Sequence, residues 1–406
     1  MRKINPSNFR IATRGTSREI NRQIALDLVR THQPISRADL ARIMGLHRGA
    51  VSLIINDLLT EGLIFEGATG ESHRGRKPTF LYIDSRKRCV LAVDIRVTRT
   101  YLMVTDLIGR QLVTTSSFPT KRDPKKLVEE LSKRIKQLLS DHKEVGSCEG
   151  IGVVVPGMVD RQTRRIIHAP TIGWHDVEIR ELLAAATGLP VHLENSGKAC
   201  ALAQMWARRG DAAAIDDLVF VSVSDGIGVG VIVNGEVLRG QHNIAGEFGH
   251  LPLSIDGPRC SCGAMGCWEA YISNLATLSR YFGRDLREAK PVTSDVATFT
   301  IEDLIVRARA GDAKAVAALQ ATARYLGLGL ASIVNAIDPT RIYIGGEIVA
   351  AWDLIEPAVR TALVERALSP EAAKTEIRIV PLDDHPRLRG AAALVAAPAF
   401  AAPAVA

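Results

Sequence analysis

The sequence lacks the features of secreted and membrane-spanning proteins. No charged stretch followed by an apolar run stands at the N-terminus, so we expect no signal peptide. The alanine-rich stretch GAAALVAAPAFAAPAVA at residues 390–406 is short and interrupted by proline, so we do not expect it to span a bilayer. Only 6 of the 406 residues are cysteine, and three of these are clustered. A reducing compartment, the cytoplasm, is therefore favoured over a disulfide framework.

Acidic residues are scarce in the first fifth of the chain. Residues 1–88 hold 16 Lys and Arg against 8 Asp and Glu, whereas the remaining residues hold 35 against 36. This asymmetry indicates a nucleic-acid-binding module joined to a nearly neutral body. A solvated basic tail is the alternative, but the helical patterning of the segment argues against it. A chain of this length is expected to form two or three domains.

Residues 16–59 show the pattern of three short helices. A capping-box signature begins at Thr16, and apolar residues then recur every four positions to about Arg30. The same signature at Ser36-Arg-Ala-Asp39 begins a second helix, which Gly45 ends. A third helix is predicted over residues 47–59, with its apolar side facing inward. Two short helices joined by a glycine-containing turn, after a supporting helix, are typical of an all-α helix-turn-helix module.

The segment after these helices predicts a wing. Residues 63–83 read as two strands around a polar, glycine-rich turn, whose basic tip could contact phosphates or the minor groove. A solvated basic loop is the alternative for this tip. The exposed N-terminal half of the third helix is expected to enter the major groove of double-stranded operator DNA. The predicted DNA contacts are Arg37, His47, Arg48, Ser52, Asn56, Arg74, Arg76 and Lys77.

Residues 245–269, AGEFGHLPLSIDGPRCSCGAMGCWE, contain one histidine and three cysteines within a short glycine-rich loop. This ligand set suits a tetrahedral Zn²⁺ ion, and four protein ligands leave no coordination position for a reactive water, so the ion would be structural. A set of reduced, buried cysteines is the alternative. Glu247 and Glu269 flank the loop and could accept hydrogen bonds from sugar hydroxyls. The predicted zinc ligands are His250, Cys260, Cys262 and Cys267.

The motifs GEFGH and CxCGxxGCxE in this loop resemble the signature of the ROK family of sugar kinases and sugar-responsive repressors. The resemblance implies a duplicated actin-like α/β ATPase fold with a ligand cleft between its halves. This duplicated fold agrees with the strand-turn-strand patterns near residues 89–113 and 218–238. We expect a winged helix-turn-helix domain over residues 1–84, as in the family's repressors. A first α/β subdomain over 85–215 follows, and a second over 216–406 carries the zinc loop and the C-terminal helices.

The loops that carry phosphoryl transfer in the family's kinases differ in this chain. Asp94-Ile-Arg-Val-Thr98 stands where the kinases have Asp-x-Gly-Gly-Thr, so side chains fill the space for phosphate. Asp225 adds a negative charge to the second phosphate loop, which would repel a polyphosphate. Ser196 replaces the catalytic aspartate, and serine cannot act as a carboxylate base towards a sugar hydroxyl. We therefore predict that the protein is not an enzyme.

Five positions that the family uses for sugar binding are retained, whereas one differs. Thr171 stands where family members often have Asn, and His250 would face the sugar with the ring nitrogen that does not bind zinc. The residues that the resemblance implies for sugar binding are Gly157, Asn195, Glu247, His250 and Glu269.

We therefore predict a sugar-responsive DNA-binding regulator, a repressor, of carbohydrate uptake or catabolism genes. It would bind a monosaccharide without phosphorylating it, and would act as a homodimer or a dimer of dimers. Xylose, glucose, N-acetylglucosamine and their phosphates all suit such a cleft. The alternatives are an ATP-dependent sugar kinase with a DNA-binding domain, and a regulator that is titrated by a protein partner.

Overall fold

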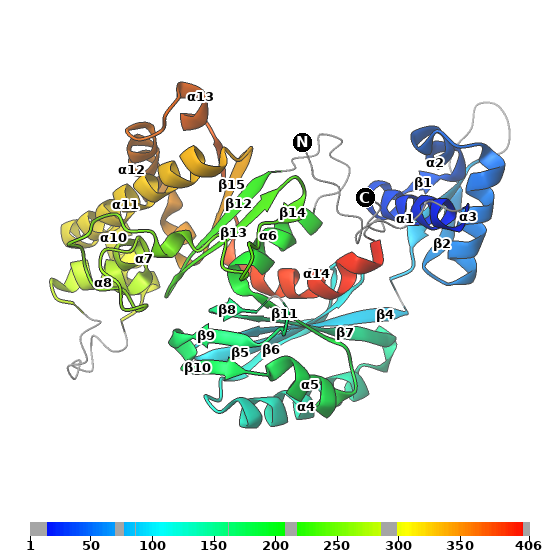
Figure 1. The fold of residues 1–406 in the computed structure, drawn as a ribbon, viewed down its shortest axis with the longest axis horizontal. Coiled ribbons are helices and arrows are strands. Elements are labelled where there is room, and N and C mark those ends of the chain that lie inside the picture. Colours follow the sequence, from blue (N-terminus) through cyan, green and yellow to red (C-terminus); the bar gives the residue numbers. More distant parts are fainter. Residues whose placement is uncertain are drawn as a thin grey trace.

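The computed structural model describes residues 14–69, 77–85, 87–160, 162–207, 217–285 and 299–400. They form a small N-terminal module and two larger lobes, which we call lobe I and lobe II (Figure 1). Among these residues, no helix is long and apolar enough to cross a membrane. The predicted wing residues Arg74 and Arg76 lie outside the described residues, as do residues 1–13.

The N-terminal module contains the three predicted helices. The box at Ser36 is confirmed, because its hydroxyl accepts from the backbone N–H of Asp39 at 3.1 Å and the Asp39 carboxylate accepts in return. The predicted cap at Thr16 is wrong, because the first helix begins two residues earlier. Polar residues are common both at the N-cap and in the first turn of a helix, so the polar residues 16–19 do not fix where the helix begins. The elements are α1 (Arg14–His32), β1 (Ile35–Ser36), α2 (Arg37–Met44), α3 (Arg48–Thr60), β2 (Ile64–Thr69) and β3 (Thr79–Ile83), with the sheet in the order β1-β3-β2.

Lobe I is a five-stranded sheet in the order β11-β7-β4-β5-β6. The pairs β4–β5 and β5–β6 are antiparallel, whereas β4–β7 and β7–β11 are parallel. Apolar side chains of α4 and α5 cover one face of this sheet. The elements are β4 (Arg88–Ile95), β5 (Arg99–Asp106), β6 (Gln111–Pro119), α4 (Pro124–Asp141), β7 (Ser147–Val155), α5 (Ile179–Thr187) and β11 (Val191–Asn195), with a small sheet of β8 (Met158–Val159), β9 (Ile166–Ala169) and β10 (Trp174–Val177).

Lobe II repeats the same layout. Its sheet runs β14-β13-β12-β15-β16, again with three antiparallel strands followed by two parallel ones. The identical order and direction of strands confirm the predicted duplicated α/β fold. The long helix α11 packs with α12 and the sheet in one apolar core. The elements are β12 (Leu218–Val223), β13 (Ile227–Val233), β14 (Glu236–Val237), α7 (Glu269–Ile272), α8 (Asn274–Phe282), α10 (Ile301–Arg309), α11 (Ala313–Ile337), β15 (Arg341–Gly345), α12 (Trp352–Val364), α13 (Pro370–Ala373) and β16 (Glu376–Ile379).

Two helices, α6 (Ser196–Trp206) and α14 (Pro386–Phe400), form the layer between the two sheets (Figure 1). Helix α14 packs on β4 and β7 of lobe I, and α6 packs on β12 and β13 of lobe II. The two helices also contact each other so closely that a Cβ on Gly390 would lie 2.1 Å from the carbonyl oxygen of Ala199. Helix α14 is thus the last described element of the chain but covers the first lobe.

Candidate functional site

A cavity of about 520 Å³ lies where the two lobes meet. Its lining comes from the ends of β4, β7 and β11 in lobe I, from the turn before β13, and from the segment that leads into the cysteine-rich loop. This volume is within the range of small-molecule sites. The lining includes all five residues that the sequence predicts for sugar binding: Gly157, Asn195, Glu247, His250 and Glu269.

The side chain of Asn195 is already held by the protein. Its Oδ1 atom caps α6 by accepting from the N–H groups of Gly197 at 2.8 Å and Lys198 at 3.2 Å. Its Nδ2 atom donates to the carbonyl oxygen of Gly157 at 2.8 Å. Gly157 has φ +93°, and a Cβ there would lie 2.3 Å from the His168 carbonyl oxygen, so the turn requires glycine. One Nδ2 hydrogen of Asn195 therefore remains for a ligand.

The carboxylate of Glu247 is the acceptor that is free at this end of the cavity. It makes no side-chain hydrogen bond to any residue that the structure describes, although it is half-buried. Burial raises the pKa of Glu247, and the nearby positive charge of Lys198 opposes that rise. A ligand hydroxyl would satisfy this carboxylate with a charge-assisted hydrogen bond.

The carboxylate of Glu269 is differently placed, because both of its oxygens are in use. Oε2 accepts from the backbone N–H of Ile227 at 2.8 Å, and Oε1 accepts from the hydroxyl of Ser261 at 2.9 Å. Glu269 thus ties the cysteine-rich loop to the turn before β13. Its remaining lone pairs could still accept from a ligand.

The four predicted metal ligands converge. One ligand atom from each of His250, Cys260, Cys262 and Cys267 lies within 4.8 Å of the others. The Sγ atoms of Cys262 and Cys267 are 3.7 Å apart, and Sγ of Cys260 is 3.7 Å from Nδ1 of His250. Burial and the neighbouring thiols raise the pKa of Cys267 to about 12. The cluster could hold a metal ion, and the Nε2 side of His250 would then remain for the cavity.

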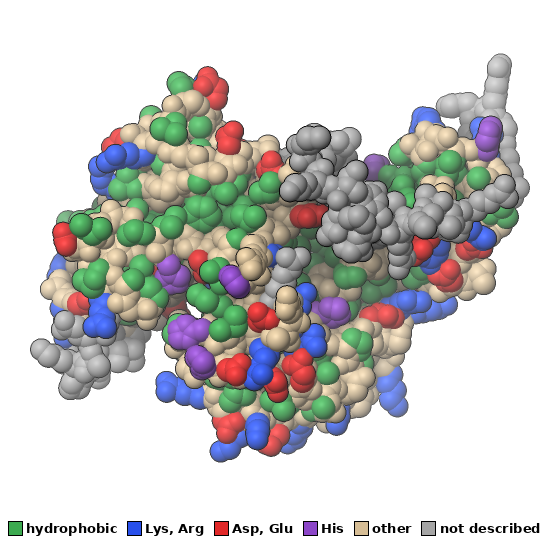
Figure 2. Space-filling model, in the orientation of Figure 1, with side chains coloured by type: hydrophobic (Ala, Val, Ile, Leu, Met, Phe, Trp, Pro, Cys, Tyr) green, Lys and Arg blue, Asp and Glu red, His purple; other side chains and the backbone are tan. Residues whose placement is uncertain are grey.

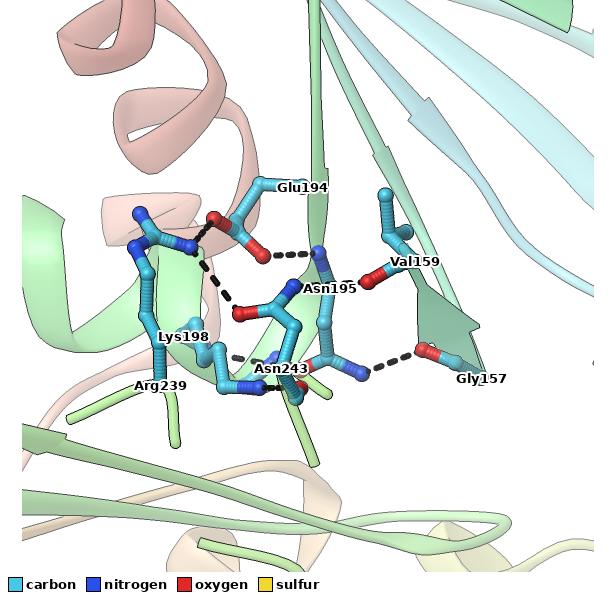
Figure 3. Close-up of polar contacts among 8 residues, drawn as sticks. Gly157, Val159, Glu194, Asn195, Lys198, Arg239 and Asn243 are labelled. Atoms are coloured by element: carbon cyan, nitrogen blue, oxygen red, sulfur yellow. Dashed lines mark hydrogen bonds and ion pairs between the residues drawn. The ribbon is translucent and has the colours of Figure 1, made fainter. Parts of the chain in front are cut away.

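A buried polar network that the sequence did not predict lies behind Asn195 (Figure 3). Lys198, only 1% exposed, donates from Nζ to the carbonyl oxygen of Asn243. The amide of Asn243 donates to the Val159 carbonyl at 2.7 Å, and Arg239 pairs with the buried carboxylate of Glu194.

This network joins two segments that contribute to the cavity. It fastens the segment before Glu247, from lobe II, to β8 and β11 of lobe I. Burial lowers the pKa of Lys198, and the carboxylates of Glu194 and Glu247 oppose that shift. The only sequence signal was a lysine within the otherwise small and apolar stretch SGKACALA.

Arg96, which also lines the cavity, forms an ion pair within lobe I. The fully buried Asp94 accepts from Nε of Arg96 at 2.6 Å, and the Arg96 guanidinium lies 4.6 Å from the centre of the Tyr101 ring. Burial alone would lower the pKa of Arg96, but the adjacent Asp94 charge outweighs it and the net shift is upward. Asp225 and Ser196 also line the cavity. A guanidinium therefore lies next to the aspartate with which a phosphate loop of the kinase type would begin.

The predicted DNA contacts fall into two groups in the structure. Arg48 and His47 are exposed at the start of α3. Arg37, in contrast, donates to Glu66 of β2 at 2.9 Å and to the side chain of Asn56 at 3.0 Å, so these two predicted contacts are engaged with each other. Lys77 is exposed just before β3.

Of the residues predicted on the exposed face of α3, His47, Arg48 and Asn56 are exposed. Ser52 is half-buried, whereas Leu53 is 64% exposed. The reason is that Val51, Ile54 and Ile55 turn into the core, which leaves Leu53 outside.

On the face drawn in Figure 2, acidic and basic side chains are interspersed over lobe I, without an extended patch of one sign.

Comparisons with known proteins agree with this arrangement. The model of the ROK family matches residues 90–397. The xylose repressor of Bacillus subtilis is 29% identical over 360 residues, which are 88% of this chain and 90% of the repressor. The crystal structure of a ROK family transcriptional regulator, a homologue of the E. coli MLC protein, superposes with a TM-score of 0.78 at 26% identity, over 95% of this chain and 97% of that one.

A kinase of the same family matches less of the chain. A ROK family glucokinase from Streptomyces griseus, in complex with glucose and AMPPNP, superposes with a TM-score of 0.64 at 27% identity. It covers 75% of this chain and 98% of its own. A quarter of this chain therefore has no counterpart in that kinase, whereas the regulators match nearly all of it.

Proposed function

Because the chain belongs to the ROK family, we propose that it is a sugar-responsive repressor that binds operator DNA and a monosaccharide and does not phosphorylate the sugar. The single observation that carries this proposal is the contrast within one cavity. Five residues suited to sugar hydroxyls line it, while Arg96 occupies the phosphate end. The likeness to a xylose repressor and to a transcriptional regulator over nearly the whole chain supports the same reading.

The N-terminal module is the proposed DNA reader, a winged helix-turn-helix over residues 1–84. Helix α3 would enter the major groove with Arg48 and His47 at its exposed start, and Lys77 would meet the backbone beside the groove. Such modules commonly act in pairs on palindromic sites, so we propose a homodimer or a dimer of dimers. Reduced thiols and DNA are both found in the cytoplasm, where we place the protein.

The two α/β lobes are the proposed sensor, divided near residue 216. The cavity between them would take one monosaccharide, with Glu247 and the Nε2 side of His250 as the principal contacts and Asn195 and Glu269 in support. Xylose, glucose and N-acetylglucosamine are the first sugars to test. Binding would shift the equilibrium between two arrangements of the lobes by its differential affinity for them.

We propose zinc as the ion of the cysteine-rich loop. Zinc–sulfur bonds of about 2.3 Å in a tetrahedron place neighbouring sulfurs about 3.8 Å apart, which fits the 3.7 Å between Cys262 and Cys267. When bound, the ion would supply structural cross-linking and charge. His250, Cys260, Cys262 and Cys267 would hold it, and the closed ligand set leaves no position for catalysis.

Two measurements test the proposal. Thermal-shift screening of the full chain against D-xylose, D-glucose and N-acetylglucosamine should raise the melting temperature with at least one sugar, because a bound ligand stabilises the folded state. A phosphotransfer assay with MgATP and the same sugars should show no sugar-dependent ADP. Sugar-dependent turnover would establish the rival function, a kinase with a DNA-binding domain. DNA binding without any sugar binding would favour a regulator controlled by a protein partner.

A further inference from the structure

The DNA-binding module is attached to the body at two places. The first is the chain itself, which passes directly from β3, ending at Ile83, to β4, beginning at Arg88. The second is a contact of α1 with the last residues of α6 and α14. Figure 1 shows the end of α14 beside α1. One attachment would leave the module free to swivel, whereas two attachments define its orientation.

The second attachment is centred on Arg30 of α1. Its guanidinium lies 4.1 Å from the centre of the Trp206 ring and 5.8 Å from the centre of the Phe400 ring. Nη1 of Arg30 donates to the Trp206 carbonyl oxygen at 3.2 Å, and Asp27 holds the same guanidinium at 2.8 Å. The side chain of Arg30 is only 12% exposed, so the cation–π contact is largely shielded from water. Cation–π contacts are stronger when they are desolvated.

Helix α6 connects this attachment to the cavity. Its N-cap is Asn195, which lines the cavity, and its last residue is Trp206. Eleven helical residues span about 16 Å as one rigid element. The helix also cannot shift freely, because a Cβ on Gly230 would lie 2.3 Å from the Gly197 carbonyl oxygen. Helix α6 follows directly after β11 of lobe I in the chain, but it packs on β13 of lobe II.

We propose that α6 transmits sugar occupancy to the DNA-binding module, with Arg30 and Trp206 as the positioning residues that couple the two. A sugar that hydrogen-bonds to Asn195 and alters the angle between the lobes would move α6 relative to β4. The module is fastened to both elements and would have to reorient. Neither Arg30 nor Trp206 touches the sugar cavity or the exposed face of α3, so their effect is on the coupling.

The inference rests on the proposed function, and the test separates the two. Full-length zinc-loaded protein is titrated onto a duplex selected from a random pool by the wild type, with and without D-xylose, D-glucose or N-acetylglucosamine. Sugar affinity is measured separately by calorimetry. Allosteric coupling typically changes affinity by about 5- to 150-fold. We expect Arg30→Met and Trp206→Leu to reduce that factor to below about 2, with sugar affinity unchanged.

Conservative and control variants make the result specific. Trp206→Phe keeps an aromatic face under the guanidinium and should restore most of the coupling. Arg22→Met removes another arginine of α1, which pairs with Glu61 inside the module, and should respond as the wild type does. Wild-type coupling in both Arg30→Met and Trp206→Leu would overturn this inference alone. If no sugar alters the operator affinity of the wild type, the proposed sugar response and this inference both fail.

Discussion

Two carboxylates at or next to the interlobe cavity, those of Glu247 and Asp94, differ in their partners. The carboxylate of Glu247 has no side-chain hydrogen bond to a described residue, and Nδ1 of the nearby His250 faces Cys260. Asp94 is fully buried, and its Oδ2 atom accepts from Arg96 at 2.6 Å, whereas its Oδ1 atom has no hydrogen-bond partner among the described residues. Glu247 is therefore open to a polar ligand, while the charge of Asp94 is paired with an arginine of the same chain.

On the proposed function, this difference would allow sugar binding to be kept while phosphoryl transfer is lost. A buried carboxylate needs a compensating charge, which a metal–nucleotide complex would supply in a kinase. Arg96 supplies that charge here. On the proposed function, the cavity would then need no nucleotide to balance Asp94 and could serve as a sensor.

Loss of the metal cluster should have the largest effect on this contrast. We expect Cys267→Ser to abolish zinc retention and to weaken sugar binding more than about 100-fold, because the loop that orients His250 loses its cross-link. Metal content and calorimetry with the sugar identified by thermal shift give the readout. Cys148→Ser, on β7 outside the cluster, is the matched control. Full sugar affinity in metal-free protein would contradict the assigned role of the cluster.

Replacement of the free carboxylate should have the next largest effect. Glu247→Gln removes the charge but preserves the shape, and hydrogen bonds to charged groups contribute about 1.5–3 kcal/mol. Sugar affinity should fall by roughly 10- to 100-fold, while operator binding without sugar is unchanged. Glu236→Gln, an exposed residue of β14, should leave both affinities as they are. An unchanged sugar affinity in Glu247→Gln would show that this carboxylate does not meet the ligand.

The sequence predicted the fold and the convergence of the four candidate metal ligands better than it predicted side-chain hydrogen bonds. The strand patterns are local, so they revealed the repeated lobes. The metal ligands lie within 18 residues of one another, so their spacing is informative. In contrast, Lys198 reaches Asn243, 45 residues away, and no local pattern reports such a pair.

Two further features depend on tertiary geometry. The family resemblance implies Glu269 as a sugar acceptor, and only the structure shows that its two oxygens also accept from Ile227 and Ser261. On α3, Asn56 is exposed and Ser52 is half-buried, and the exposure of Leu53 follows from the inward packing of its neighbours.

The buried lysine should have a moderate effect at the sugar-binding end. Lys198→Met fills the same volume but leaves the Asn243 carbonyl without its donor and Glu194 with less positive charge nearby. An unsatisfied buried acceptor costs about 1–3 kcal/mol. We expect a lower melting temperature and a sugar affinity reduced by about 3- to 10-fold, since the segment before Glu247 loses a tether. Lys133→Met on the exposed side of α4 should change neither quantity. Equal sugar affinities in both variants would confine Lys198 to folding stability.

The smallest effect is expected where a kinase residue is put back. Ser196 is the first residue of α6 and lines the cavity, so Ser196→Asp restores a carboxylate at the position of the lost base. An aspartate in the first helical turn is favourable by about 0.3–1 kcal/mol, so the fold should tolerate it. Sugar affinity should change by less than about 3-fold, and no sugar-dependent ADP should form, because Arg96 still pairs with Asp94 where nucleotide would bind. Measurable turnover in Ser196→Asp would mean that the missing base alone had silenced the cavity, and that the ion pair at its phosphate end does not exclude nucleotide.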